Sequence, residues 1–163
     1  VSRLPLETCE TMNGMWGYKL VDQDYKSTET LIRYLVSAAG KGANLLMNVG
    51  PQPNGEIPAV ALQRLKEMGE WTKKYGETIY GTTAGDLPVQ PWGVTTRKGD
   101  RLFVHIMNLD ATELLLPVDC KVKKAFLFDD KRVVKTKRTK EGVKLFFDEK
   151  PSGVDYIVEL VTK

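Results

Sequence analysis

The sequence is poor in the residue types that most often build nucleophilic and metal sites. It has one histidine, His105, and two cysteines, Cys9 and Cys120, among 163 residues. A Ser-His-Asp mechanism could therefore be built only around His105. The cysteines lie far apart and belong to no CxxC motif or Cys/His cluster, so we expect no metal site. A disulfide between them is possible, but no feature of the sequence favours it.

Several longer motifs are missing too. No run of about 18 or more apolar residues is present, so we expect no membrane span. The first residues lack the charged and then apolar layout of a signal peptide. Neither the GxGxxG nor the GxxxxGK[ST] motif occurs, and we expect no cofactor.

The positive charge of the chain does not indicate a nucleic-acid partner. Its net charge of +3 is too small to imply a polyanion by itself. Lysine and arginine concentrate between Lys121 and Lys144, where they alternate with Val, Ala, Leu and Phe as on the solvent face of strands. No stacking platform or recognition helix accompanies them, so we expect no nucleic-acid binding.

The composition that is present is that of a folded protein. Hydrophobic residues make up 42% and charged residues 28%, which is typical of globular chains. The pattern changes near residue 85: helices alternate with strands before it, and only strands and turns follow it. We therefore predict an α/β plus all-β protein with domains at residues 1–84 and 85–163.

The first half is predicted to contain two strand–helix units. A short strand is expected before Thr11, and apolar spacing predicts a helix over 28–39 with Ser27 as its N-cap. The segment "ANLLMNVG" predicts a strand buried on both faces, as in a parallel sheet. A second helix runs from Pro58 to about Tyr75 and is expected to bury Leu62, Leu65, Met68 and Trp71. Two such units cannot close a barrel, so we expect a partial (β/α) barrel.

The second half is predicted to be an antiparallel β-sandwich. Short strands are separated by turn signals at 98–100, 129–130, 141–142 and 151–153. His105 lies inside the apolar strand "LFVHIM", where a hydrogen-bonded structural histidine is favoured over a catalytic one.

The chemistry is expected in "LETCETMNGMWGYKL", at residues 6–20. In an α/β barrel, active-site residues lie past the C-terminal ends of strands, and we place Glu7 near such an end. A carboxylate there can act as a general acid or base, and one beside an aromatic ring such as Trp16 is typical of a carbohydrate site. Structural roles stay open: Glu7 as an ion-paired loop carboxylate, Trp16 as core, and Asn44 and Asn48 as loop-holding residues.

Three stretches carry a family resemblance. "ETCETMNGMWGY", "LIRYLVSAAGKGANLLMNVGPQPNGEIP" and "RLKEMGEWTKKYGETIYGT" follow in order. They closely resemble the C-terminal part of the catalytic domain of the α-L-fucosidases of glycoside hydrolase family 29, over about residues 5–84. The second half is similar in kind to the β-sandwich that follows the barrel in this family.

The resemblance implies a retaining exo-glycosidase that removes terminal α-L-fucose from fucosylated glycans, with two cooperating carboxylates. Glu7 matches the glutamate of the family motif and is implied to be the general acid/base. Trp16 matches an aromatic that packs against the fucose ring, and Asn44 and Asn48 match supporting residues. The family implies no metal, and it suggests a secreted, periplasmic or lysosomal location.

The sequence also departs from the family pattern. Leu6 replaces the usual Trp before the glutamate, Ala43 the second Gly of Gly-Gly-Asn, and Met47 the third Leu. The nucleophilic aspartate of the family lies upstream of the glutamate motif, on a barrel strand that does not precede Val1. We therefore expect this chain alone to be inactive, with the remainder of the barrel as its structural partner.

The alternative function is a non-catalytic carbohydrate-binding or interaction module. A sugar-binding sandwich should expose aromatic side chains on one face. Most aromatics after residue 85 alternate with polar residues as core residues do, so we expect them to face inward.

Overall fold

The computed structural model describes residues 4–163. The two α-helices and the one 3₁₀ helix are α1 (Thr28–Gly40), α2 (Ala59–Tyr75) and η1 (Gly76–Thr78). The strands are β1 (Leu6–Thr11), β2 (Ala43–Asn48), β3 (Thr83–Ala84), β4 (Gly93–Lys98), β5 (Arg101–Ile106), β6 (Glu113–Leu116), β7 (Val122–Leu127), β8 (Lys135–Thr139), β9 (Gly142–Phe146) and β10 (Tyr156–Thr162). No helix in the described part of the chain is long and apolar enough to cross a membrane.

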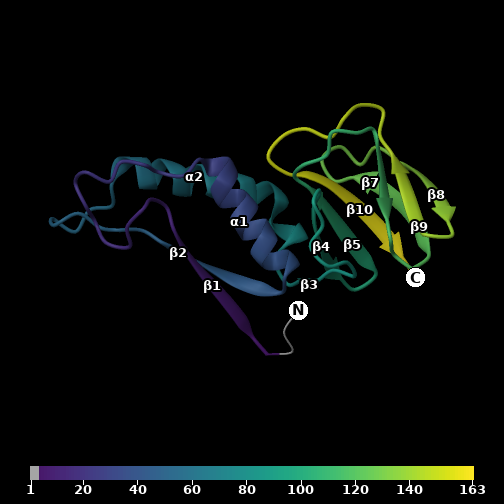
Figure 1. The fold of residues 1–163 in the computed structure, drawn as a ribbon, viewed down its shortest axis with the longest axis horizontal. Helices are drawn as coiled ribbons and strands as arrows, with labels where there is room; N and C mark the ends of the chain where they lie inside the picture. Colours follow the sequence, from purple (N-terminus) through teal and green to yellow (C-terminus); the bar gives the residue numbers. More distant parts are fainter. Residues whose placement is uncertain (1–3) are drawn as a thin grey trace.

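The strands form three sheets. β1 and β2 pair in parallel, β3-β4-β5-β10-β7 form a five-stranded antiparallel sheet, and β6-β9-β8 form a three-stranded one. The two antiparallel sheets make the sandwich, and α1 and α2 lie between it and the parallel pair (Figure 1). The predicted fold class is confirmed, and no closed barrel is present among residues 4–163.

The sandwich encloses the first of two cores. Side chains alternate across a strand, so every second residue points to the same face. On β5, Leu102, Val104 and Ile106 face the three-stranded sheet, and Val158 and Leu160 of β10 join them. Each fully buried side chain of this kind contributes roughly 1.5–3 kcal/mol. Its buried residues all lie between Leu87 and Leu160, so the helices contribute none of them.

The second core joins the two halves of the chain. The intervening residues of the five-stranded sheet, Val94, Phe103 and Ile157, point away from the sandwich interior and pack with Met12 and with residues of the helices such as Leu31. The contact is close, since a Cβ added at Gly40 of α1 would lie 2.5 Å from the Cβ of Val94. The five-stranded sheet is therefore buried on both faces.

The domain boundary at residues 84 and 85 stays a prediction. Thr83 and Ala84 already pair with Arg97 and Thr96 of β4, so the five-stranded sheet begins before that boundary.

The parallel pair is covered on one face only. Met47 of β2 packs into the second core, but Leu46, on the opposite face, is 51% exposed. The prediction that this strand is buried on both faces is wrong for the described chain, because the helices cover only one side of it. Leu62 and Leu65 of α2 are exposed, so their predicted burial is wrong. Met68 and Trp71 of the same helix are buried as expected.

Capping and turn residues predict the start of α1 and the turn between β4 and β5 correctly. Ser27 is the N-cap of α1, and its hydroxyl accepts a hydrogen bond from the Thr30 amide at 3.1 Å. The predicted hairpin turn is confirmed between β4 and β5, with Gly99 at φ 60°. A left-handed conformation of this kind costs glycine little.

A buried polar chain crosses the junction between the halves. His105 Nδ1 lies 2.7 Å from Asp155 Oδ2, and both side chains are fully buried. His105 Nε2 lies 3.2 Å from Thr96 Oγ1, which donates to the Thr78 carbonyl of η1 at 2.5 Å. His105 is thus a hydrogen-bonded structural residue, as the sequence predicted.

Two arginines reinforce the junction. Arg33 of α1 donates to the carbonyls of Val154 at 3.0 Å and Met107 at 2.7 Å. Arg101 bonds both Glu77 of η1 and Glu159 of β10. The Arg101 guanidinium lowers the pKa of the Glu77 carboxyl below its ordinary value.

The first prediction concerns this junction. Asp155→Ala leaves the buried Nδ1 of His105 without its partner, which costs about 1–3 kcal/mol of unfolding free energy. Urea unfolding followed by circular dichroism measures the loss. Asp119→Ala is the control, since the side chain of Asp119 is fully exposed and its removal should leave the midpoint unchanged. Equal midpoints for both variants would contradict a stabilising role for the buried pair.

Candidate active site

The candidate site lies where the two parallel strands end. β1 and β2 are in register from Leu6 opposite Ala43 to Thr11 opposite Asn48, so both C-terminal ends meet at one edge. The loops after these strands form the end of the molecule away from the sandwich (Figure 1). In α/β architectures this edge carries the reactive groups.

Asn48 connects the two strand ends. Its Nδ2 donates to Thr11 Oγ1 at 3.0 Å and to the Trp16 carbonyl at 2.7 Å. The hydroxyl of buried Thr11 in turn lies 3.2 Å from the Met15 carbonyl. Asn48 therefore holds the loop that carries Trp16, which is the loop-holding role that the sequence left open for it.

Lys26 closes the same loop from its other end. Its Nζ donates to the carbonyls of Thr11 at 2.7 Å and Asn13 at 3.1 Å, and lies 3.3 Å from Glu10 Oε1. Glu10 also accepts from the Thr11 amide at 2.9 Å. Glu10 is thus an ion-paired structural carboxylate. The role of Lys26 could not be predicted from the sequence, because its partners are backbone carbonyls that only the folded loop brings together.

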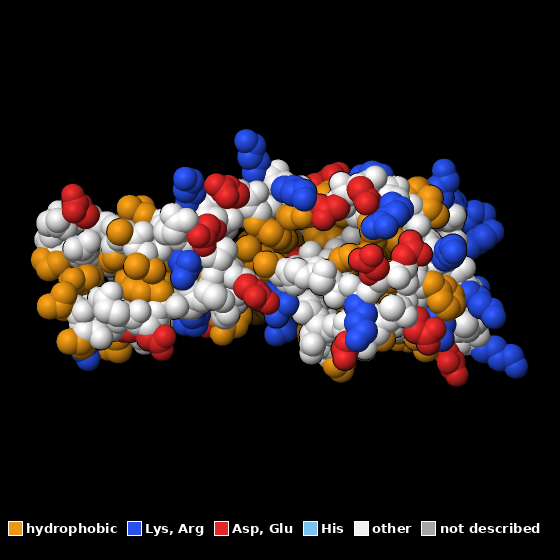
Figure 2. All heavy atoms as spheres, turned by 90° about the horizontal axis from the view of Figure 1, so that it is seen from above, with side chains coloured by type: hydrophobic (Ala, Val, Ile, Leu, Met, Phe, Trp, Pro, Cys, Tyr) orange, Lys and Arg blue, Asp and Glu red, His pale blue; other side chains and the backbone are white. Residues whose placement is uncertain are grey.

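The loop presents apolar surface to solvent. The Trp16 side chain is 54% exposed although its carbonyl is held by Asn48. Met15, Leu20 and Val21 are also exposed, and hydrophobic side chains gather at this end of the molecule in Figure 2. An exposed indole beside other apolar groups suits contact with a ligand or with another polypeptide segment.

Glu7 does not lie at the C-terminal end of its strand. It is the second residue of β1, opposite Asn44, and its side chain is exposed. At about 3.3 Å per residue, it lies about 13 Å along the strand from Thr11. The predicted placement near the strand end is therefore wrong, because β1 begins at Leu6 and runs on to Thr11.

The face on which Glu7 lies is the uncovered one. Strand alternation puts Glu7 on the face of Thr11 and Asn48, and Glu10 on the face toward the helices. Glu7 is thus the only carboxylate of the described β1 and β2 residues on the open face.

A hollow of about 440 Å³ lies beside β1, and Glu7 is among the residues that line it. It is bordered by β1 and β2 and by Tyr34, Ser37 and Lys41 of α1. The helix α1 packs mainly over β2, so the helix-facing side of β1 is left partly uncovered.

No metal site is evident. Within residues 4–163, no group of three or more His, Cys, Asp or Glu side chains could hold an ion. Near the loop, burial and the Asp22 carboxylate raise the pKa of the Tyr25 phenol above its ordinary value, so this group is neutral at physiological pH.

We compared the sequence and the structure of this chain with those of known proteins. The sequence profile described as "Alpha-L-fucosidase" matches residues 1–77. The structure of α-L-fucosidase isoenzyme 1 from Paenibacillus thiaminolyticus superposes over 98% of this chain with a TM-score of 0.88 and 33% identity. The chain therefore matches the α-L-fucosidase family, through residues 1–77 in sequence and along nearly its whole length in fold.

Two further relatives support the assignment. The plasma α-L-fucosidase of Rattus norvegicus is 43% identical over 79 residues, which are 47% of this chain. A fucosidase of glycoside hydrolase family 29 from Bacteroides thetaiotaomicron, solved as a trapped covalent intermediate, is 25% identical over 96% of the chain with a TM-score of 0.85.

The fucosidase relatives are much longer than this chain. It spans 17% of the rat enzyme, 40% of the Paenibacillus enzyme and 38% of the Bacteroides enzyme.

The second prediction concerns the Trp16 loop. A Cβ at Gly50 would lie 2.7 Å from the Tyr18 nitrogen and 2.8 Å from the Gly17 carbonyl carbon. Gly50→Ala must therefore displace the loop backbone and speed amide hydrogen exchange over residues 13–21. Gly69→Ala is the matched control, since its Cβ would meet no atom within 4 Å and alanine favours the helix. Unchanged exchange in Gly50→Ala would contradict the close approach.

Proposed function

We propose that these residues form part of a retaining α-L-fucosidase that hydrolyses terminal α-L-fucose from glycans. The observation that carries the proposal is the edge at which β1 and β2 end, with the Trp16 loop held over it, in a chain that matches the α-L-fucosidase family. Trp16 would supply the apolar wall for the sugar.

Retention rests on the chemistry of a relative. The Bacteroides fucosidase was trapped as a covalent intermediate with 2-fluoro-fucosyl fluoride in a variant with a glutamate changed to glutamine. A covalent glycosyl-enzyme is the intermediate of retaining hydrolysis, in which one carboxylate attacks and a second transfers protons. Carried to this chain, the same chemistry needs two carboxylates about 5–5.5 Å apart.

We assign the proton-transfer role to Glu7, because it is the carboxylate on the open face of the parallel pair. The assignment makes a geometric demand. A general acid must come within about 3 Å of the leaving oxygen, so the substrate must reach the level of Glu7, below Thr11 on the strand.

The nucleophile must come from residues other than these two strands. β1 and β2 offer no second carboxylate on the open face, and the hollow beside α1 leaves room for further elements to cover β1. We propose that the remainder of a (β/α) barrel completes the site and covers this surface.

The third prediction tests the acid/base role. In a protein that joins these residues to a complete barrel, Glu7→Gln should lower kcat/KM about 10²–10⁴-fold for fucosides with poor leaving groups. Aryl fucosides with good leaving groups should lose much less, since they need little protonation. Glu10→Gln is the matched control and should show no dependence on the leaving group. Equal losses for all leaving groups in Glu7→Gln would place the general acid elsewhere.

The fourth prediction concerns the 163-residue polypeptide itself. Its strands β1 and β2 carry no nucleophilic carboxylate beside Glu7 on the open face. It should therefore not hydrolyse an aryl α-L-fucoside faster than the uncatalysed reaction in buffer, because removing one member of a cooperating pair lowers the rate by orders of magnitude. Release of the phenol, measured over hours at high protein concentration, checks this. Turnover that Glu7→Gln abolishes would show that the two-carboxylate requirement is wrong.

A further inference from the structure

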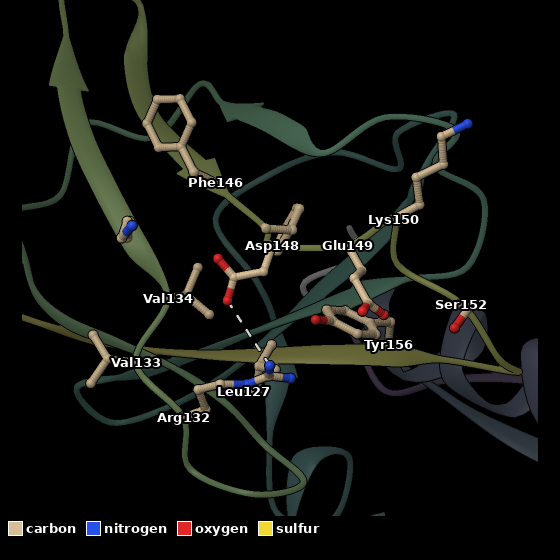
Figure 3. Close-up of a pocket in the computed structure, with 12 residues that line it drawn as sticks. Leu127, Arg132, Val133, Val134, Phe146, Asp148, Glu149, Lys150, Ser152 and Tyr156 are labelled. Atoms are coloured by element: carbon tan, nitrogen blue, oxygen red, sulfur yellow. Dashed lines mark ion pairs between the residues drawn. The ribbon is translucent and has the colours of Figure 1, made fainter.

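A second cavity lies in the sandwich, far along the chain from the Trp16 loop. It has a volume of about 160 Å³, and all of its lining residues fall between 127 and 156 (Figure 3). It opens where β7 and β9 end and β10 begins, at one end of the space between the two sheets. None of its residues belongs to the β1–β2 site.

The floor of the cavity is the end of the sandwich core. Leu127, Val134 and Phe147 line it, and all three are nearly buried in the first core. The Tyr156 ring packs edge-on against Phe147 with centroids 5.7 Å apart. These side chains give the cavity an apolar floor, while polar atoms make up most of its exposed lining.

The rim carries two charged groups that do not hydrogen-bond each other, and Arg132 Nε also lies 3.5 Å from Asp130 Oδ2. Arg132 Nη1 and Asp148 Oδ2 are 4.0 Å apart, which is longer than a hydrogen bond, and their side chains are 58% and 74% exposed. Figure 3 shows the two groups pointing toward each other, with the Tyr156 ring beside them. Within the described chain the Tyr156 hydroxyl has no hydrogen-bond partner.

The Tyr156 hydroxyl is available as a donor. Burial raises the pKa of this phenol above its ordinary value, so it keeps its proton at physiological pH. The cavity thus offers a neutral donor and acceptor, a carboxylate acceptor and a guanidinium donor around an apolar floor.

We propose that this cavity binds one neutral sugar residue of a glycan, as a non-catalytic site on the sandwich. A sugar ring presents an apolar C–H face, which fits the floor of Leu127, Val134 and Phe147. Neighbouring hydroxyls donate to Asp148 and accept from Arg132, which fills the gap between these two groups. Tyr156 contributes its ring edge and its hydroxyl.

Size and charge select this ligand class. The cavity of about 160 Å³ is small and open to solvent, so it suits a single ring with the rest of a glycan extending outward. The lining mixes lysine and arginine with aspartate and glutamate, so it does not favour an anion. The site is independent of hydrolysis, so the proposed function can fail while this one holds.

The experiment is a titration of the ¹⁵N-labelled 163-residue chain with the methyl glycosides of L-fucose, D-galactose and N-acetyl-D-glucosamine. At least one sugar should shift amide resonances at Asp148 and Tyr156 saturably in the millimolar range and leave residues 6–18 unshifted. Asp148→Asn should weaken binding about tenfold or more, because a hydrogen bond to a charged group is lost. Tyr156→Phe should weaken it several-fold while keeping the ring contact.

Two matched controls separate the pocket from general surface effects. Asp119→Asn changes an exposed carboxylate elsewhere on the sandwich, and Tyr80→Phe removes an exposed phenol outside the cavity. Both should bind as the unmodified chain does, and the spectra report whether each variant is folded. The proposal is overturned if none of the three sugars shifts the pocket resonances, or if binding survives unchanged in both Asp148→Asn and Tyr156→Phe.

Discussion

The second core, shared between the helices and the five-stranded sheet, is the contact on which the other features depend. Two parallel strands are too few to be stable alone, and their edges and one face are open. They are held because α1 packs on β2 with one side and on Val94 of β4 with another. Phe103 and Ile157 extend that contact from the sandwich. The sandwich thus acts as the support of the candidate site.

The buried polar chain at this junction gives the contact a defined orientation. Apolar packing alone tolerates some sliding, whereas His105, Thr96 and the Thr78 carbonyl fix one arrangement of η1 against β4 and β5. Arg33 does the same for α1 through two backbone carbonyls. One end of the molecule is therefore rigidly coupled to the other, although no pathway between the Trp16 loop and the sandwich cavity is implied.

The two strands contribute different residues to the candidate site. β2 supplies Asn48, which holds the Trp16 carbonyl, and Gly50, just after β2, lets the loop backbone approach. β1 supplies Glu7 on the open face and Glu10 on the helix side, and only the first is free of ion pairs with Lys26. Glu7 and Glu10 therefore have different surroundings, because strand alternation puts them on opposite faces.

Much of the fold could be predicted from the sequence. Both helices and the sandwich could be predicted from the 3.6-residue spacing, the Ser27 cap and the turn residues, because these signals are local. The exposure of Leu46, Leu62 and Leu65 could not be predicted, because an apolar pattern reports what a residue tolerates and not which neighbour covers it. The position of Glu7 along β1 could not be predicted, because the ends of the strand are set by its pairing with β2. The contacts of Lys26 could not be predicted either, because every residue has a backbone carbonyl and the sequence does not indicate which ones will accept a hydrogen bond. The expectation that sandwich aromatics face inward holds for Trp92 and Phe147, whereas Phe103 faces the helices in the second core. Tyr156 is partly buried and ends the core-facing row of β10 at the cavity.

The central claim is that the site-bearing strands and the sandwich form one cooperative unit through the second core. Native-state hydrogen exchange of the 163-residue chain in increasing urea measures this most directly. The account predicts that amides of α1 around Leu31 and Val36 and amides of β5 and β10 around Phe103 and Ile157 open with the same free energy and the same urea dependence. Exchange of the helices through a separate opening of lower free energy, with the sandwich still protected, would contradict it.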